Sequence, residues 1–335
     1  MTHAHWSSLS GPTLGRRAAL LGLAGACAAA APASAVAATL LVAGPGGGRL
    51  DEWANLVAPS LVRALPGAGR MARRAMGGVD GVTAANSFDA LVTPDGATAL
   101  LVPGAAPLAW LAGDQRAQFD PSRWVPVWAS LASAVLLTRA PLAPGRRLRV
   151  PALGAAGPVL PMLLALDLLG IEAAVLPPGA ALSPGEVDAV FLSGPGTAQA
   201  AATLQAAGLR PALALGTPEG AGWGRDPAFP GVPTAVHQVG ARGAPPALAT
   251  ALRATAAAVQ LDAALVLPEL SQAGLVSAWQ HASSRIAADP DVLTAAAAQG
   301  VRSGDAAASA ALMGAIAAGG PAIPSLQRWL VTRHG

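Results

Sequence analysis

Short apolar runs alternate with helix-like segments along this chain of 335 residues, and Gly or Pro separates most of them. We expect the runs to be buried strands, at residues 39–43, 97–103, 127–138, 147–152, 187–192 and 212–216. The segments with apolar residues at helical spacing are 51–64, 160–169, 247–259, 274–287, 291–299 and 305–318. Such alternation is typical of parallel sheets covered by helices, in which ligands bind beyond the carboxyl ends of the strands.

The N-terminal segment has the layout of an export signal. A polar stretch ends in the pair Arg16-Arg17, an uncharged run covers residues 18–31, and the tripeptide Ala33-Ser34-Ala35 follows. A positive region, an apolar region and a small-x-small tripeptide in this order predict cleavage after Ala35. We therefore expect residues 1–35 to be a signal peptide and the mature protein to work outside the cytoplasm.

Three other interpretations of this segment stay open. Residues 13–17 partly match a twin-arginine signal. With the strand at 39–43 added, the apolar run approaches the length of a membrane anchor, although Pro32 and the cleavage-like tripeptide argue against one. Cys27 would be a lipid attachment point in a lipoprotein, but alanine stands where leucine is usual three residues earlier. Cleavage would remove this only cysteine and with it any disulfide or thiol nucleophile.

The mature chain of about 300 residues is long enough for a large core and two domains. The formal net charge of the full sequence is +3, and every basic residue is arginine because the sequence has no lysine. The arginines are scattered, so the basic face with interleaved aromatic residues that binds nucleic acid is not visible. After the signal, no apolar run is long enough to span a bilayer.

A glycine-rich loop from Gly44 to Gly48 lies between the first predicted strand and the first predicted helix. Glycines let the backbone approach a ligand, and the N–H groups at a helix start favour an anion. The loop is not a Walker A motif, because no Gly-Lys-Ser/Thr follows, and Arg49 and Asp51 break the spacing of a dinucleotide fingerprint. By itself it is equally compatible with a plain tight turn.

The usual catalytic and metal-binding motifs do not occur. The segment Ser193-Gly194-Pro195-Gly196 lacks the preceding glycine of a nucleophile elbow. His237 and His281 have no neighbour at metal-ligand spacing. The tryptophans at 53, 110, 124, 128 and 223 are predicted to fill the core or a domain interface and not to stack on a ligand. We expect neither an enzyme nor a metal or cofactor site.

Several motifs follow one another in the mature chain. They are Gly46-Gly47-Gly48-Arg49-Leu50-Asp51, Gly77-Gly78-Val79-Asp80-Gly81, TPDGATALL at 93–101, FDP…WVPV at 119–127, GEVD at 185–188, LRPALA at 209–214, FPGVPT at 229–234 and ADPDV at 288–292. Their order and spacing resemble the substrate-binding proteins of tripartite tricarboxylate transporters, the TctC-like or Bug family. The resemblance covers nearly the whole mature chain.

The resemblance implies a type II periplasmic binding protein, an α/β protein of two lobes. Each lobe would be a sheet flanked by helices, and crossing strands would join lobe 1 (36–140 and 236–335) to lobe 2 (141–235). Such a protein is expected to be a periplasmic monomer that closes over a small organic acid and presents it to membrane transporter subunits. The alternative is a family member repurposed as a sensor or adaptor, with a membrane sensor as its partner and no role in transport.

The resemblance also implies which residues hold the carboxylate, through backbone N–H groups of glycine loops and small hydroxyl side chains. The implied site comprises Gly46, Gly47, Gly48, Asp51, Gly77, Gly78, Pro103, Gly104, Ala105, Gly154, Gly157 and Asp188. Asp51 has a second interpretation, as a cap of the first helix, and the two are weighed equally.

The chain departs from the family pattern where that pattern offers hydroxyl groups. The segments Pro103-Gly104-Ala105-Ala106 and Gly154-Ala155-Ala156-Gly157-Pro158 contain no Ser or Thr, and the loop at 176–180 is shortened. Asn55 stands where arginine is usual, and His237 stands in place of a glutamate. Because each lost hydroxyl removes a hydrogen-bond donor, we expect an unusually apolar pocket that takes a more hydrophobic acid or binds little.

Overall fold

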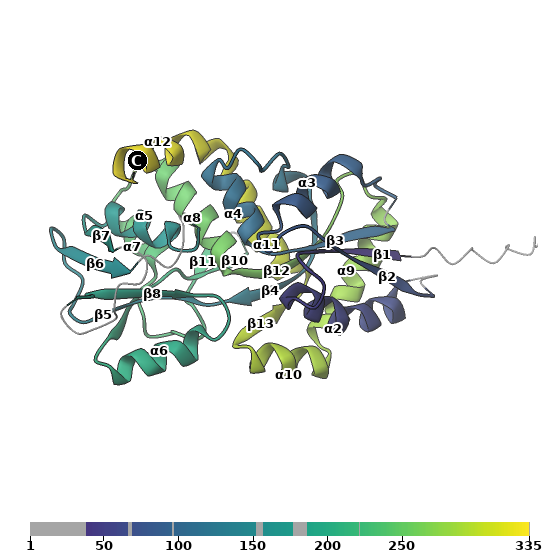
Figure 1. Ribbon diagram of the computed structural model, residues 1–335, viewed down its shortest axis with the longest axis horizontal. Coiled ribbons are helices and arrows are strands. Elements are labelled where there is room, and N and C mark those ends of the chain that lie inside the picture. The colour runs from purple at the N-terminus through teal and green to yellow at the C-terminus, as the bar shows by residue number, and fades with distance from the viewer. Residues whose placement is uncertain are drawn as a thin grey trace, which may run out of the picture.

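The computed structural model describes residues 38–65, 69–95, 97–151, 157–176, 186–220 and 222–334. The predicted signal peptide, Cys27, Gly154 and most of the shortened loop after Leu176 lie outside these residues. Figure 1 shows the described chain as two lobes side by side, with crossing strands between them and helices around both.

The larger sheet, in lobe 1, has six strands in the order β13-β4-β12-β3-β1-β2. Their bounds are β1 Ala38–Ala43, β2 Met71–Met76, β3 Thr98–Val102, β4 Val125–Ala132, β12 Leu261–Leu267 and β13 Val301–Gly304. Only β2, β1 and β3 pair in parallel, while β12 and β13 are antiparallel to their neighbours. The expectation of a parallel sheet is therefore wrong for half of it, because two strands enter from the C-terminal part of the chain in the opposite direction.

Helices cover both faces of this sheet. They are α2 Arg49–Ala64, α3 Val82–Leu91, α4 Ala105–Ala112, α9 Ala273–Ala287, α10 Pro290–Ala298 and α11 Ala306–Ala317, with the short turn η1 Pro121–Arg123 before β4. The helix α2 shows why the sequence pattern works, because its residues Trp53, Val57 and Leu61 recur at helical spacing and are fully buried. Trp53 meets Trp128 of β4 edge to face at 5.3 Å, which joins α2 to the middle of the sheet.

Lobe 2 is smaller and has a three-stranded sheet in the order β8-β5-β9 and a parallel pair β6-β7. The elements are β5 Ala134–Thr138, β6 Arg147–Pro151, α5 Leu160–Leu168, β7 Glu172–Leu176, β8 Ala189–Ser193, α6 Thr197–Ala206, β9 Arg210–Ala214 and α7 Ala235–Ala241. In Figure 1, α6 lies below the sheet, and α5 and α7 lie above it. The backbone hydrogen bond from Asp188 to Arg149 (3.0 Å) joins the β6-β7 pair to the edge of β8.

The chain crosses between the two lobes at the junction of β4 with β5. β4 of lobe 1 passes into β5 of lobe 2 through Ser133. A second crossing follows β9 and leads into the hairpin of β10 Thr217–Glu219 and β11 Gly222–Gly224. The carboxylate of Asp226, which is 1% exposed, accepts hydrogen bonds from the Ser133 hydroxyl (2.8 Å) and from the Ala134 N–H (3.4 Å). This buried aspartate ties the two crossings together.

The C-terminal helices reach across both lobes. Helix α8, Pro246–Gln260, packs on α5 of lobe 2 and on α4 and α11 of lobe 1. Helix α12, Ile323–His334, is tied to α5 by the hydrogen bond from Trp329 to Asp167 (2.7 Å). The predicted lobe bounds, 36–140 with 236–335 and 141–235, stay a prediction. In the structure, the chain passes from the six-stranded to the three-stranded sheet at Ser133.

One stretch of the described chain, Ala306–Arg333, is apolar and long enough to cross a membrane by length and composition. It is bent at the turn η2 Gly320–Ala322 and buries Leu312, Ile316 and Leu326 in the common core.

Candidate functional site

A cleft of about 590 Å³ lies between the two lobes. Lobe 1 contributes the end of β3, helix α4, the junction of α8 with β12 and the start of α2, while lobe 2 contributes the approaches to α5 and α6. The lining residues are Arg49, Asp80, Pro103, Gly104, Ala105, Leu108, Ala109, Ala112, Asp114, Arg116, Ala132, Gly157, Pro158, Ser193, Gly194, Pro195, Ala258, Val259, Leu261 and Asp262.

Helices from both lobes begin at this cleft. Ala105 is the first residue of α4, and Arg49 is the first residue of α2. From the other side, Pro158 lies two residues before α5 and Pro195 two residues before α6. The first N–H groups of a helix have no partner inside the helix and carry its positive end, so their convergence favours an anion.

Gly104 is required at this place by packing. A Cβ atom on this residue would collide with the carbonyl oxygens of Ala258 and Leu261. The Gly104 N–H donates to the Leu261 carbonyl at 3.0 Å, so it is not available to a ligand. Gly104 therefore brings the turn after β3 close to the junction of α8 with β12 and shapes the cleft floor.

The floor also contains a buried ionic network centred on Asp262. This carboxylate is 4% exposed and accepts two hydrogen bonds from Arg49, at 2.7 and 2.8 Å. The Trp53 indole N–H and the Ser130 hydroxyl both donate to its Oδ2 at 2.9 Å. The network satisfies a buried charge and fixes the Arg49 guanidinium at the start of α2, where it lines the cleft.

At the mouth of the cleft, Arg116 bridges two aspartates. Its guanidinium lies 2.7 Å from Asp114 and 3.0 Å from Asp80. These hydrogen bonds, first that of Asp114, raise the pKa of Arg116 above its usual value. The same contact with Arg116 lowers the pKa of Asp114, so the Arg116–Asp114 pair is charged at neutral pH.

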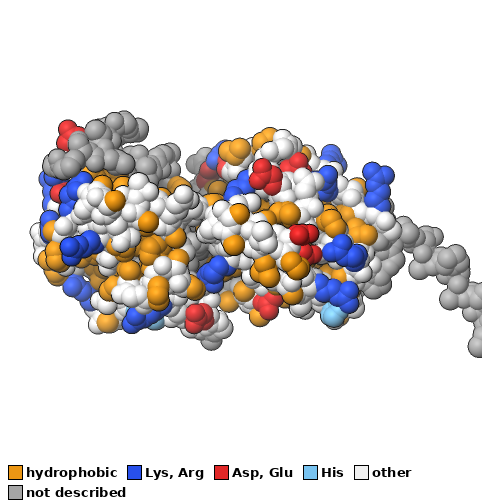
Figure 2. Space-filling model, turned by 90° about the horizontal axis from the view of Figure 1, so that it is seen from below, with side chains coloured by type: hydrophobic (Ala, Val, Ile, Leu, Met, Phe, Trp, Pro, Cys, Tyr) orange, Lys and Arg blue, Asp and Glu red, His pale blue; other side chains and the backbone are white. Residues whose placement is uncertain are grey.

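The lining as a whole is mainly apolar and its charges are paired. Ser193 is the only hydroxyl side chain among the lining residues of the described chain, as the missing Ser and Thr residues predicted. The charged members are two arginines and three aspartates. On the outside, the face in Figure 2 shows arginines in separate groups between apolar and neutral surface. No group of three His, Cys, Asp or Glu side chains in the described residues is arranged to hold a metal ion.

Four of the residues expected in the site line the cleft: Pro103, Gly104, Ala105 and Gly157. The glycines of the first glycine loop do not line the cleft. Gly46 and Gly47 are exposed, and the Gly48 N–H donates to the Pro45 carbonyl at 3.2 Å. The Gly47 N–H donates to Asp51 at 2.9 Å, so Asp51 closes the loop onto α2. This contact agrees with the interpretation of Asp51 as a residue that caps the start of the first helix, and not with its interpretation as a ligand-binding residue.

The second glycine loop lies beside the cleft. Gly77 and Gly78 are exposed and do not line it, although Asp80 of the same loop does. Asp188 was also expected in the site and lies elsewhere, because Arg149 holds its carboxylate through two side-chain hydrogen bonds, at 2.9 and 3.0 Å. That contact, with Arg149 as the largest cause, lowers the pKa of Asp188 to about 2. Asp188 therefore joins β6 to β8 and is not available to a ligand in the cleft.

Sequence reasoning placed none of the six polar side chains of the cleft lining in the site: Arg49, Asp80, Asp114, Arg116, Ser193 and Asp262. Arg49 was noted only because it breaks a nucleotide-binding motif, and Ser193 only because it lacks a nucleophile elbow. Asp262 was not considered, although a lone aspartate in the apolar run Leu261–Leu267 is a signal of a buried partner. Its partner Arg49 is 213 residues away, so no local pattern connects them.

No protein-family model and no curated protein matches the sequence. Among solved structures, the chain is similar to a TctC solute-binding protein from Polaromonas, at 16% identity and a TM-score of 0.62, over 88% of this chain and 98% of that one. It is also similar to MatC from Rhodopseudomonas palustris with bound malate, at 20% identity and a TM-score of 0.47, over 87% and 98%. The periplasmic binding protein BugD has 15% identity and a TM-score of 0.46, over 88% and 97%. The first of these likenesses shows that the chain has the two-lobed α/β fold of a TctC-type solute-binding protein, as its motifs predicted.

Proposed function

We propose that this protein is an extracytoplasmic solute-binding protein that captures a small carboxylate between its lobes. The observation that carries the proposal is the convergence of helix starts from both lobes on one cleft of about 590 Å³. A ligand held by α4 from one lobe and by α5 and α6 from the other would favour the closed arrangement of the lobes. The fold of a TctC-type protein supports a binding role and not an enzymatic one.

A carboxylate fits the donors that remain free. Arg49 uses Nε and Nη2 on Asp262, and its Nη1 has no partner in the described residues. The Ala105 N–H at the start of α4 and the Ser193 hydroxyl are further candidates. Because Leu108, Val259 and several alanines form most of the remaining wall, the ligand is an acid with an apolar portion.

A second candidate ligand follows from the balance of charge. The cleft lining has three aspartates and two arginines, so a solute with an ammonium group as well as a carboxylate would balance it better than an acid alone. An amino acid is therefore the natural competitor in a binding assay.

The predicted N-terminal export signal and the family motifs support a role for the closed, ligand-bound form at the membrane. The protein acts in the periplasm and presents its closed form to the membrane subunits of a tripartite tricarboxylate-type transporter. The alternative is presentation to a membrane sensor without transport. Loss of uptake of the identified acid in cells that lack the protein would support transport, while unchanged uptake with a lost cellular response would support sensing.

A thermal-shift and calorimetric screen tests the ligand class. The protein, purified after export of the full chain, is titrated with mono- and dicarboxylates of increasing chain length and with amino acids. We expect saturable stabilisation by an acid, and Ala105→Trp, which fills the cleft at the start of α4, should abolish it. The matched control is Ala200→Trp in the first turn of α6, because Ala200 is also exposed and lines no part of the cleft. Absence of any response, or a response that survives Ala105→Trp, would refute the proposal.

A further inference from the structure

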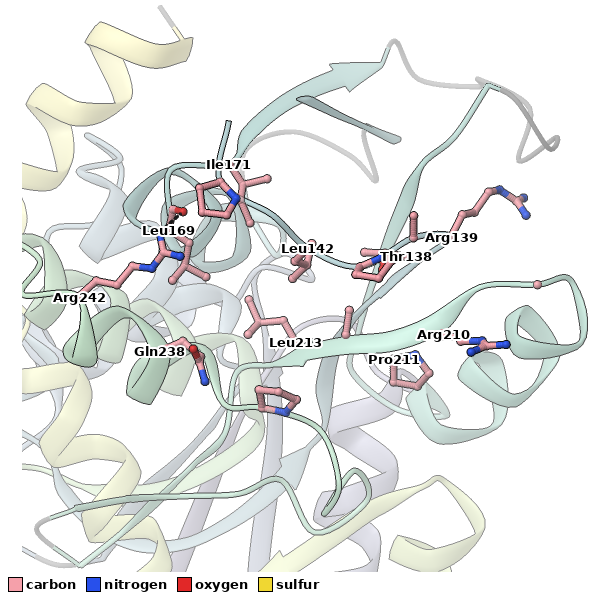
Figure 3. Close-up of a pocket in the computed structure, with 16 residues that line it drawn as sticks. Thr138, Arg139, Leu142, Leu169, Ile171, Arg210, Pro211, Leu213, Gln238 and Arg242 are labelled. Carbon is pink, nitrogen blue, oxygen red and sulfur yellow. Dashed lines mark hydrogen bonds between the residues drawn. The ribbon is translucent and has the colours of Figure 1, made fainter. Parts of the chain in front are cut away.

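A second cavity of about 570 Å³ lies within lobe 2 and shares no lining residue with the cleft. The crossing strands show how the two are separated. β4 ends at Ala132, which lines the cleft, and β5 continues to Thr138, which lines the second cavity. The two cavities therefore lie at opposite ends of this crossing. Figure 3 shows the second one between the segment after β5, strand β9, the end of α5 and helix α7.

The body of this cavity is apolar. Leu169, Ile171 and Leu213 line it and are 5%, 4% and 2% exposed, so these three side chains form a buried apolar part of its wall. Leu142 and Pro211 complete the wall, and Figure 3 places Leu142 and Leu213 at its centre. A pocket of this size and lining is typical of sites that enclose the apolar part of a small organic molecule.

The charged groups of this cavity are all positive. Arg139, Arg210 and Arg242 line it, and no aspartate or glutamate is among its lining residues. Arg139 donates to the carbonyls of Val187 and Ala207, and Figure 3 shows its side chain turned away from the cavity. Arg210 forms none of the ion pairs found among the described residues. The local field therefore favours an anion.

The best-defined polar end is formed by Arg242 and Gln238 of α7 and the turn that follows it. Arg242 donates Nη1 to the Leu169 carbonyl at 2.7 Å, which fixes the guanidinium beside the buried leucine and leaves Nε and Nη2 for a ligand. Gln238 lies at the same end in Figure 3 and adds an amide group. A guanidinium and an amide next to an apolar wall match a carboxylate that carries a hydrocarbon chain.

We propose that lobe 2 has a second ligand-binding site, which takes an aliphatic monocarboxylate of medium chain length. Its carboxylate binds at Arg242 and Gln238, and its chain lies along Leu142 and Leu213. The site does not depend on the function proposed for the cleft, because the two share no residue.

Titration with octanoate, below the concentration at which it forms micelles, tests the site. We expect saturable binding of octanoate by calorimetry, weaker binding of octanol, which lacks the charge, and none of octylamine, which has the opposite charge. Arg242→Gln should weaken octanoate binding about tenfold or more, since a charge-assisted hydrogen bond is lost. Ala140→Trp, in the loop that lines the cavity, should abolish binding by filling the space.

The chain offers a closely matched control. Arg225→Gln removes another exposed arginine of lobe 2 whose Nη1 also donates to a backbone carbonyl at 2.7 Å, that of Pro230, but which lines neither cavity. Octanoate should bind this variant and the cleft variant Ala105→Trp like the unaltered protein. Loss of binding in Ala105→Trp with retention in Ala140→Trp would place octanoate in the cleft, and equal binding by all variants would show non-specific association. Either result would overturn the proposal, as would octylamine binding as well as octanoate.

Discussion

The inter-lobe cleft and the lobe 2 cavity have nearly the same volume, about 590 and 570 Å³. They differ in whether their lining arginines are paired with lining aspartates. In the cleft, both lining arginines form ion pairs with lining aspartates. In the lobe 2 cavity, the arginines have no acid beside them and bind carbonyl groups or nothing in the described residues. Paired charges stabilise the local structure, whereas arginines without an acidic partner attract an anionic ligand. In the cleft the attraction for an anion must therefore come mainly from the helix starts.

The largest expected effect is the loss of unfolding free energy when the buried carboxylate of Asp262 is removed, compared with the loss when a surface carboxylate is removed. Asp262→Ala should lower the free energy of unfolding by about 3 kcal/mol, because it leaves Arg49, Trp53 and Ser130 without their common buried acceptor. Urea unfolding measures this. The matched control, Asp305→Ala, removes a helix-cap acceptor of two N–H groups at the surface and should cost about 1 kcal/mol. Equal losses in the two variants would contradict the structural role of the cleft charges.

The second prediction tests whether the two cavities are independent. At a ligand concentration about 100 times its dissociation constant, the cleft ligand should stabilise the protein by about 2.7 kcal/mol. Ala105→Trp should remove this stabilisation, whereas Ala140→Trp should leave it unchanged. If Ala140→Trp also removes this stabilisation, ligand binding in the cleft depends on the lobe 2 cavity, and the two are not independent sites.

The third prediction concerns the ion pair between Arg149 and Asp188, which joins β6 to the edge of β8 in lobe 2. The pKa of Asp188 is about 2, lowered mainly by its hydrogen bond with Arg149. Since the folded-state pKa is below the unfolded one, the pair stabilises the protein above pH 4 and loses this effect as the pH falls towards 2. Asp188→Asn should cost about 1–2 kcal/mol at neutral pH, and its difference from the unaltered protein should shrink over this window. A difference independent of pH from 6 to 2 would rule out the linkage.

The smallest expected effect concerns an arginine of the lobe 2 cavity. Arg210→Gln should change the free energy of unfolding by less than about 0.5 kcal/mol, because the side chain is exposed and has no ion pair in the described residues. Arg149→Gln is the comparison, since it breaks the bidentate contact with Asp188 and should cost more. Urea unfolding of both variants at low ionic strength is the measurement. A large loss in Arg210→Gln would mean that the cavity arginines stabilise the fold and are not free for a ligand.

Much of the fold could be predicted because its signals are local. The predicted strand at 39–43 and helix at 51–64 are confirmed as β1 and α2, and the four C-terminal helices predicted after residue 246 are confirmed as α8 to α11. The strand β2 was missed because its sequence, MARRAM, is an exposed edge with no apolar alternation. The central strand β12 was missed because it follows α8 directly, without Gly or Pro, in one apolar run.

The candidate site was predicted only in part. The turn after β3 was located by its motif, and Pro103, Gly104 and Ala105 do line the cleft. The glycines of the two loops and Asp188 do not line it, because motif resemblance indicates where loops occur and not which atoms they turn towards a ligand. Asp51 and Asp188 instead bind neighbouring parts of their own lobes, the Gly47 N–H and Arg149.

The sequence by itself determined the α/β class, the order of the main elements and the apolar character of the cleft wall. These properties depend on periodicity and on residue type within short windows, which the chain carries locally. Only the tertiary structure decided that Arg49 meets Asp262, that helices of both lobes begin at one cleft, and that the lobe 2 cavity has three arginines and no acid among its lining residues. Those contacts join residues far apart in the chain. They depend on packing and on the pairing of charges in the folded protein, which no local sequence pattern contains.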